Sequence, residues 1–394
     1  MKIYLFDTIE THENLLPLSF TRPTADFRCG ILTIKEKWER YLGRECSFYP
    51  VEYLRQKFGD IKNKEEESLF IAGNVLPETE IIEAVKNISS GEAILKGENP
   101  VVYKGSLNAL ELKDWQEREF KVEIETLDYT FDVFLKNGEE IKKDFELITE
   151  GRTGAPVPDC VRILSTGTET GNLIFIEEGA KVECISINVS RGPVYIGKDA
   201  EVMEGACIRG PFALCESSTV KMGAKIYKGT TIGPHCKVGG EISNTMIFGY
   251  SNKAHDGYLG DAVIGEWCNI GAGANASNLK NDYSKIRVWN YRTRSFMRTD
   301  LQFCGLIMGD HSKVGVNCMI NTATVMGVGV NLHGAGFPRT YLPCFSEGSA
   351  TTGFDKVSLS KFLDIAERVM GRRGIKPSES EVTLLTHVYE MQEK

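Results

Sequence analysis

A run of eight aliphatic residues spaced six positions apart constrains the fold of this chain more than any other feature. A period of six matches neither the turn of an α-helix nor the simple alternation of a strand, but it is the period of a hexapeptide β-helix. The sequence therefore predicts a solenoid in which each six-residue unit is one short strand and one corner. The run consists of Ile196, Val202, Ile208, Leu214, Val220, Ile226, Ile232 and Val238.

The residue four positions after each of these aliphatics supports the same fold, because it is small in six of the eight repeats. A small side chain lets the backbone turn a corner while the aliphatic points into a narrow prism. The same spacing returns at Ile264 and Ile270, and again at Val314 and Ile320. It is broken between 270 and 306, which indicates that a segment leaves the prism there.

Composition excludes several classes of protein. The formal charge of −8 gives no electrostatic reason to expect nucleic acid as the main partner. The first ten residues, MKIYLFDTIE, do not make a secretory signal, and no stretch reaches the roughly 18 apolar residues of a membrane span. The 11 cysteines include no Cys-x-x-Cys pair, which favours free thiols in a reducing compartment. We therefore expect a soluble cytoplasmic protein that does not bind membranes.

The chain divides into four segments. Residues 1–150 mix strand patterns, at 2–6 and 68–72, with helical patterns, at 31–42, 77–86 and 108–117, which predicts an α/β domain. Residues 151–171 are rich in Gly, Thr and Pro and are interpreted as a linker. The hexapeptide pattern dominates 172–345. Residues 346–394 predict two helices, from about 359 and 378, which we expect to cover the open sheet edge at the end of the solenoid.

Two segments within the β-helix resemble a known family. GYLGDAVIGEWCNIGAG (257–273) and SNLKNDYSKIRV (277–288) resemble the acetyltransferase half of GlmU-type bifunctional enzymes, which acetylate glucosamine-1-phosphate and then uridylylate it. Segments 15–39 and 304–328 resemble a divergent branch of GlmU-like sugar nucleotidyltransferases. The resemblance implies a nucleotidyltransferase-like α/β domain, a left-handed parallel β-helix and a homotrimer.

The resemblance also implies a set of site residues. It places the catalytic histidine at His255, and histidine suits the removal of a proton from an attacking sugar amine near neutral pH. Two lysines would contact phosphate groups of the ligand, and a tyrosine and two asparagines would contact the substrate. These substrate-binding positions are Tyr258, Asn269, Asn278, Lys253 and Lys285.

The N-terminal domain departs from the family at its nucleotide-binding loop. Sugar nucleotidyltransferases have a glycine-rich loop whose backbone amides cradle the triphosphate, but Leu18 and Phe20 replace both glycines in LPLSFTR (16–22). Four residues still match a nucleotide-binding role, and Mg²⁺ would be required if this domain is active. They are Asp7, Thr21, Arg22 and Arg28.

Two further patterns have simpler interpretations. Segment 287–298 interleaves four arginines with aromatic residues, which superficially suits single-stranded nucleic acid, but the acidic chain favours an arm that packs on a neighbouring subunit and lines the CoA site. The histidines lack the paired spacing of the zinc site in β-helix carbonic anhydrases, so we expect no metal there.

The sequence favours an acyl-CoA-dependent N-acetyltransferase, using acetyl-CoA or another acyl-CoA, that acts on an amino-sugar phosphate or a nucleotide sugar. Two alternatives remain open. In one, the N-terminal domain is a sugar-1-phosphate nucleotidylyltransferase and the β-helix oligomerises and regulates. In the other, neither site catalyses a reaction and the chain is a ligand-binding scaffold.

Overall fold

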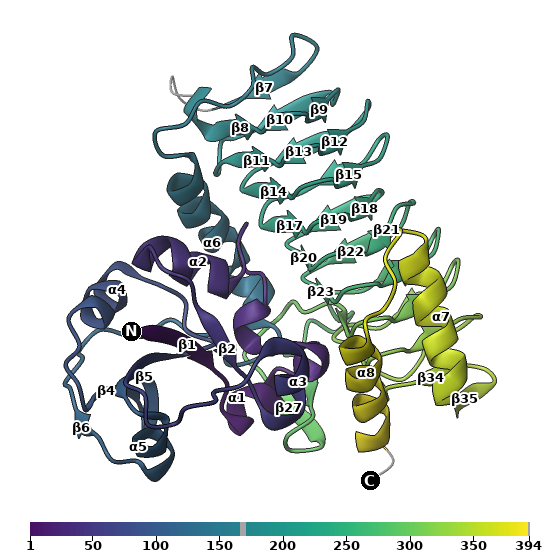
Figure 1. Ribbon diagram of the computed structural model, residues 1–394. Helices are drawn as coiled ribbons and strands as arrows, with labels where there is room; N and C mark the ends of the chain where they lie inside the picture. Colours follow the sequence, from purple (N-terminus) through teal and green to yellow (C-terminus); the bar gives the residue numbers. More distant parts are fainter. Residues whose placement is uncertain (166–170, 393–394) are drawn as a thin grey trace.

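The computed structural model describes residues 1–165 and 171–392 (Figure 1). An α/β domain is followed by a left-handed parallel β-helix and by two helices, α7 (Leu359–Gly371) and α8 (Glu379–Met391), which confirms the predicted fold class. No helix in the described ranges combines the length and apolar character needed to cross a membrane. All 11 cysteines are unpaired.

A six-stranded mixed sheet forms the centre of the N-terminal domain. Its first three strands in spatial order are parallel, and the pairings of β3 and β4 with β5 are antiparallel. Both predicted strands, 2–6 and 68–72, are observed, and their residues are almost all buried, as expected for strands covered on both faces. The spatial order is β2 (Ser47–Tyr49), β1 (Lys2–Phe6), β3 (Ser68–Ala72), β5 (Asn99–Gly105), β4 (Glu92–Lys96) and β6 (Gln116–Glu117).

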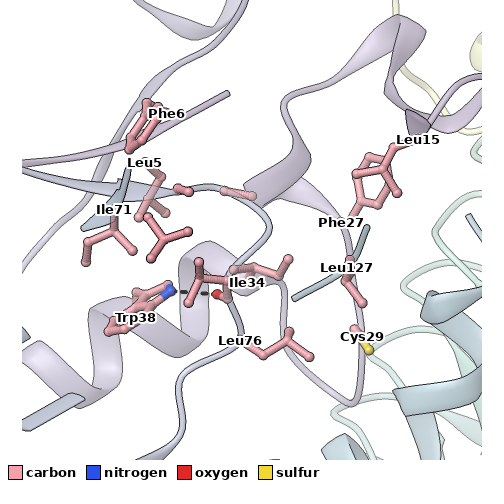
Figure 2. Close-up of a cluster of buried hydrophobic side chains, with 14 of the residues drawn as sticks. Leu5, Phe6, Leu15, Phe27, Cys29, Ile34, Trp38, Ile71, Leu76 and Leu127 are labelled. Carbon is pink, nitrogen blue, oxygen red and sulfur yellow. Dashed lines mark hydrogen bonds between the residues drawn. The ribbon is translucent and has the colours of Figure 1, made fainter. Parts of the chain in front are cut away.

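Helix α2 (Ile34–Leu42) packs on this sheet and begins three residues later than predicted. Thr33 caps it, because its side chain accepts a hydrogen bond from the Glu36 N–H while the Glu36 side chain accepts one from the Thr33 N–H. The Trp38 indole N–H donates to the Val75 carbonyl at 3.0 Å, inside the apolar cluster drawn in Figure 2. The helix is thus fixed by both its cap and its buried face.

The domain contains further short helices and one long helix that sequence reasoning missed, α6. The predicted helix at 108–117 ends early because residues 116 and 117 pair with β4. The helices and 3₁₀ turns are α1 (Ile9–Asn14), η1 (Leu18–Thr21), η2 (Thr24–Asp26), η3 (Glu52–Leu54), α3 (Arg55–Phe58), α4 (Thr79–Lys86), α5 (Leu107–Leu112) and α6 (Asp132–Thr149).

Helix α6 connects the N-terminal domain to the β-helix. Lys37 of α2 is buried and pairs with Glu140 and Asp144 of α6 at 2.7 and 2.5 Å. On its other side, the Asn137 amide of α6 donates to the carbonyl of Gly229 at 2.8 Å. The two folded parts are therefore joined by buried polar contacts as well as by the chain.

The β-helix has three sheets, named here faces A, B and C, whose strands all pair in parallel except β35 at the end of face C. Face A contains β7 (Arg162–Leu164), β10 (Ser186–Asn188), β13 (Cys207–Arg209), β16 (Lys225–Ile226), β19 (Glu241–Ser243), β22 (Tyr258–Gly260), β25 (Asn275–Ala276) and β30 (Met319–Ile320). Face B contains β8 (Ile174–Ile176), β11 (Val194–Ile196), β14 (Phe212–Leu214), β17 (Thr230–Ile232), β20 (Met246–Ile247), β23 (Val263–Ile264), β28 (Ile307–Met308), β31 (Val325–Met326) and β33 (Tyr341–Leu342). Face C contains β9 (Lys181–Val182), β12 (Glu201–Val202), β15 (Thr219–Val220), β18 (Lys237–Val238), β21 (Asn252–Lys253), β24 (Asn269–Ile270), β29 (Lys313–Val314), β32 (Asn331–Leu332), β34 (Ser346–Ser349) and β35 (Gly353–Lys356).

The predicted hexapeptide pattern is confirmed by burial. Each of the eight aliphatics from Ile196 to Val238 is at most 2% exposed, and the small residues between them are buried at the corners. The solenoid begins earlier than expected, because β7 lies within the predicted linker 151–171 and already pairs with β10. Residues 166–170 of that linker lie outside the described part of the chain.

The segment that leaves the prism forms a hairpin, β26 (Arg287–Asn290) and β27 (Ser295–Arg298). It packs on other parts of its own chain, and the expected contact with a neighbouring subunit stays a prediction. Trp289 stacks on Tyr341 with ring centroids 4.1 Å apart, and Tyr291 meets Phe20 of the N-terminal domain edge to face. Aromatic residues in this segment therefore serve the contact between domain and solenoid.

The C-terminal helices lie along the side of the solenoid rather than over its end (Figure 1). Helix α7 packs beside face C, where Phe362 contacts His311 and Phe345. Helix α8 inserts its apolar side, including Leu385, between the N-terminal domain and the last coils. The helices were expected to cover the open sheet edge. Instead, β35 pairs antiparallel with β34 at that end of face C.

Candidate functional site

His255 lies at the corner where the chain passes from face C to face A, between β21 and β22. Its side chain is exposed, and its backbone carbonyl accepts a hydrogen bond from the Lys253 ammonium. The imidazole is thus free to meet a ligand, while the backbone that carries it is held from inside the prism.

A cavity of about 470 Å³ lies between face C and helix α7, beside His255. We call it the α7 groove. It brings together His255 and Asn269, two of the residues expected from the sequence. Its lining consists of Lys237, Tyr250, Asn252, Ala254, His255, Trp267, Cys268, Asn269, Lys313, Val369, Arg372 and Arg373.

Tyr258 and Asn278 form a second group around the corner on face A. The Asn278 amide donates to the Tyr258 hydroxyl at 3.0 Å and to the Asp261 carboxylate at 2.6 Å. Neither residue lines the α7 groove. The structure therefore brings four of the expected site residues together as two pairs, one on either side of the corner. His255 lies with Asn269, and Tyr258 lies with Asn278.

Neither of the two expected lysines lines the α7 groove. Lys253 occupies the inward position of its strand, in register with Val238, and is 1% exposed. Burial lowers its pKa to about 8, although Asp256 opposes this effect. This burial inside the prism does not fit the contact with a ligand phosphate that was expected of Lys253. Lys285 lies on the excursion, is exposed, and donates to the carbonyl of Asp300.

Four basic residues that sequence reasoning missed line the α7 groove. Lys237 and Lys313 stand one position before inward aliphatics of the hexapeptide pattern, which is the signal that could have found them. Arg372 and Arg373 follow the end of α7. The Arg373 guanidinium donates to the carbonyl of His235 at 2.9 Å and to the Asn252 side chain at 3.1 Å.

A ladder of four stacked rings runs beside the groove, and two of them, Tyr250 and Trp267, line it. His235, Tyr250, Trp267 and His311 occupy equivalent corners on successive coils, all with left-handed φ values between 52° and 59°. Their ring centroids are separated by 4.8, 4.3 and 6.3 Å. Stacking between coils stabilises a backbone conformation that non-glycine residues seldom adopt.

Thr21 and Arg22, expected to bind a nucleotide, are buried at the junction of the two folded parts. The Thr21 hydroxyl donates to Asp310 at 2.7 Å, and Arg22 pairs with Asp310 and, at 3.2 Å, with Glu266. Burial opposes the charge of Arg22, but the two carboxylates outweigh it and raise its pKa. Leu18–Thr21 forms a buried 3₁₀ turn here, not an open phosphate loop.

Asp7 and Arg28 lie in the same region. Both Asp7 carboxylate oxygens accept from the Thr24 N–H at 3.2 Å, and burial raises the Asp7 pKa to about 7. Among the described residues, no cluster of three or more His, Cys, Asp or Glu side chains is arranged to hold a metal ion. Asp7 thus accepts hydrogen bonds at the start of the short 3₁₀ turn η2, and its nucleotide-binding role stays a prediction.

Arg28 lines an interdomain cleft of about 340 Å³ that shares Tyr250 with the α7 groove. Basic, acidic and aromatic side chains all line this cleft. The lining consists of Arg22, Asp26, Arg28, Thr33, Lys35, Glu36, Phe48, Pro234, Phe248, Gly249, Tyr250 and Glu266.

Comparisons with known proteins agree with this architecture. Residues 3–153 match the family model of sugar nucleotidyl transferases. A bifunctional protein GlmU from Gloeobacter violaceus is 30% identical over 129 residues, which cover 32% of this chain and 24% of the relative. The GlmU of Trichormus variabilis is 27% identical over 173 residues, or 42% and 32%.

A third relative is similar to the same degree. The bifunctional sugar-1-phosphate nucleotidylyltransferase/acetyltransferase of Sulfurisphaera tokodaii is 28% identical over 159 residues, which cover 40% of this chain and 38% of the relative. These matches span about a quarter to two fifths of the relatives' lengths. The N-terminal domain therefore matches the sugar nucleotidyl transferase family, and the chain resembles bifunctional GlmU-type proteins.

Proposed function

We propose that the chain is an acyl-CoA-dependent N-acetyltransferase that acts on an amino-sugar phosphate or a nucleotide sugar. The observation that carries this proposal is the α7 groove, which places an exposed histidine and a lining of amides beside basic side chains. The groove fits a phosphorylated acyl donor, because Lys313 is largely buried there and its ammonium bonds to the carbonyls of Trp267 and His311 rather than to a carboxylate.

In the proposed reaction His255 is the general base. Its imidazole accepts the proton of the attacking amine as the nitrogen forms a bond to the thioester carbonyl carbon. The carbon–sulfur bond then breaks, and the imidazolium returns the proton to the leaving thiolate. The Asn269 side chain, which also faces the groove, is placed to donate a hydrogen bond to the developing oxyanion.

The test is an assay of thiol release from acetyl-CoA with glucosamine-1-phosphate as the first acceptor. We expect His255→Ala to lose activity while its circular dichroism and thermal midpoint match wild type, because the side chain is exposed. His333→Ala, at another exposed histidine that directly follows strand β32 of face C, is the matched control and should keep full activity. Undiminished thiol release in His255→Ala would rule out this role.

A second candidate function is favoured by the interdomain cleft. The cleft lies where the nucleotide-binding loop of the family would be, and Arg28 and Lys35 supply positive charge beside aromatic rings. On this proposal NTP and a sugar-1-phosphate give pyrophosphate. Lys35→Ala should reduce pyrophosphate release, and Arg40→Ala, exposed on the same helix, should not.

A homotrimer, with its sites completed between prisms, is part of the same proposal. Face A carries exposed Cys207, Lys225, Asn275 and Met319 and also presents the Tyr258–Asn278 pair. A second copy on this face would complete the half of the site that lies around the corner from His255. Light scattering after size-exclusion chromatography measures the mass, and a mass of 43.8 kDa would exclude the trimer.

A further inference from the structure

The α7 groove is basic in a chain that is acidic overall. Its lining contains four lysine or arginine side chains and one histidine, and none of the described residues that line it is acidic. The chain as a whole has a formal charge of −8. Cations in a concave site that have no carboxylate partners attract an anion, because no protein group neutralises their charge.

The cations are spread along the groove instead of gathered at one point. Lys237, Asn252, Asn269 and Lys313 are register partners on four successive coils of face C. Strands lie about 4.8 Å apart, so the two lysine backbones are separated by roughly 14 Å. A single phosphate group is too small to contact both ends of this column. A ligand with two or more phosphate groups is long enough to do so.

The roof of the groove comes from the C-terminal tail of the same chain. Arg373 is held against the solenoid by its bonds to the His235 carbonyl and the Asn252 side chain, which leaves its remaining N–H groups available to a ligand. Arg372, its neighbour, is exposed and also lines the groove. Two guanidinium groups on one side thus face two lysines and two amides on the other.

We propose that the α7 groove binds a ligand carrying at least two phosphate groups, and that Arg372 and Arg373 of the tail determine its affinity. For the identity of the ligand as an acyl donor this inference rests on the proposed function, but the charge of the ligand follows from the groove alone. The tail is then part of the binding site and not a simple cover for the solenoid.

The experiment is a binding titration of the full-length protein. Coenzyme A, pyrophosphate and inorganic phosphate are the probes, and the readouts are calorimetry and the fluorescence of Trp267, which lines the groove. We expect coenzyme A and pyrophosphate to bind more tightly than phosphate, with affinity falling as salt increases. Equal, salt-independent binding of all three probes would overturn the proposal.

Variants locate the site. Arg372→Ala combined with Arg373→Ala should weaken coenzyme A binding by about tenfold or more, since charge-assisted hydrogen bonds are lost. Lys237→Ala, an exposed position with little structural role, should also weaken it. The matched control is Arg368→Ala, because Arg368 lies on α7 but pairs with Asp364 and is 78% exposed. Wild-type affinity in the arginine and lysine variants would contradict the proposal.

The proposed anion site and the proposed acetyltransferase activity can be disproved independently of each other. If coenzyme A binds in the groove and the arginine variants weaken it, but no acceptor supports thiol release, the anion site stands and the acetyltransferase does not. If thiol release depends on His255 while the KM for acetyl-CoA is unchanged in the arginine variants, the reverse holds.

Discussion

The guanidinium of Arg22 and the carboxylate of Asp310 form a buried ion pair between two parts of the chain that are 288 residues apart. Their side chains are 5% and 4% exposed, and Glu266 adds a second carboxylate at 3.2 Å. Arg22, which was expected to bind a nucleotide, therefore forms an ion pair that joins the N-terminal domain to the β-helix.

Arg22→Ala should lower the free energy of unfolding by about 3–5 kcal/mol, because it leaves the Asp310 charge buried without a counter-charge. Chemical denaturation followed by circular dichroism measures the change. The control is Arg292→Ala, whose pair with Glu10 is exposed and should contribute within about 1 kcal/mol. Equal effects of the two substitutions would show that the buried pair does not hold the domains together.

The lowered pKa of Lys253 predicts that the stability of the protein depends on pH. Burial lowers its pKa in the folded state to about 8, whereas its ordinary value is 10.5. Between these values the unfolded chain binds more protons, so the contribution of Lys253 to stability rises as pH increases through this window. At pH 7 the folded protein bears the full cost of a buried ammonium.

Lys253→Met should therefore stabilise the protein at pH 7, by about 1–4 kcal/mol, because a similar volume is kept without the charge. The advantage should shrink between pH 8 and 10.5, which denaturation at a series of pH values would measure. Lys237→Met, at an exposed position of the neighbouring coil, should show no such trend. A less stable Lys253→Met protein at pH 7 would mean that the bond to the His255 carbonyl outweighs the desolvation.

The solenoid could be predicted from sequence because its determinant is local and repeated. Each inward aliphatic from Ile196 to Val238 meets the same surroundings, so a single pattern specifies every coil. The regularity ends after Val238, where the next coil is shortened and brings Lys253 into the inward register. A strict six-residue count does not reach that position, which is why a lysine of the interior was expected to contact a ligand phosphate.

The candidate site was only partly predictable for a different reason. Asn269 lies within the matched motif 257–273 and His255 lies two residues before it, so both were found. Arg372 and Arg373 are more than 100 residues further along the chain and reach the groove through the packing of α7 on face C. Contacts of this kind depend on how apolar helix faces dock, and no local pattern encodes the docking position.

The same holds for the tail as a whole. The helical spacing predicted α7 and α8 well, and the expected start near 378 agrees with Ser378 as the N-cap. The open edge of the solenoid suggested where they would pack, but the apolar side of α8 packs in one cluster with Phe20 and Phe345. Burial of apolar area decided the position.

Leu385→Ala tests this docking. Leu385 is 1% exposed among side chains from the N-terminal domain and the last coils, so its truncation should lower the free energy of unfolding by about 2–5 kcal/mol. Val382→Ala, on the same helix and 37% exposed, is the control and should change it by about 0.5 kcal/mol or less. Because α8 contacts α7, the roof of the groove should also loosen, and coenzyme A affinity should fall in Leu385→Ala but not in Val382→Ala. If denaturation shows no difference between the two variants, α8 is not docked in solution as it is here.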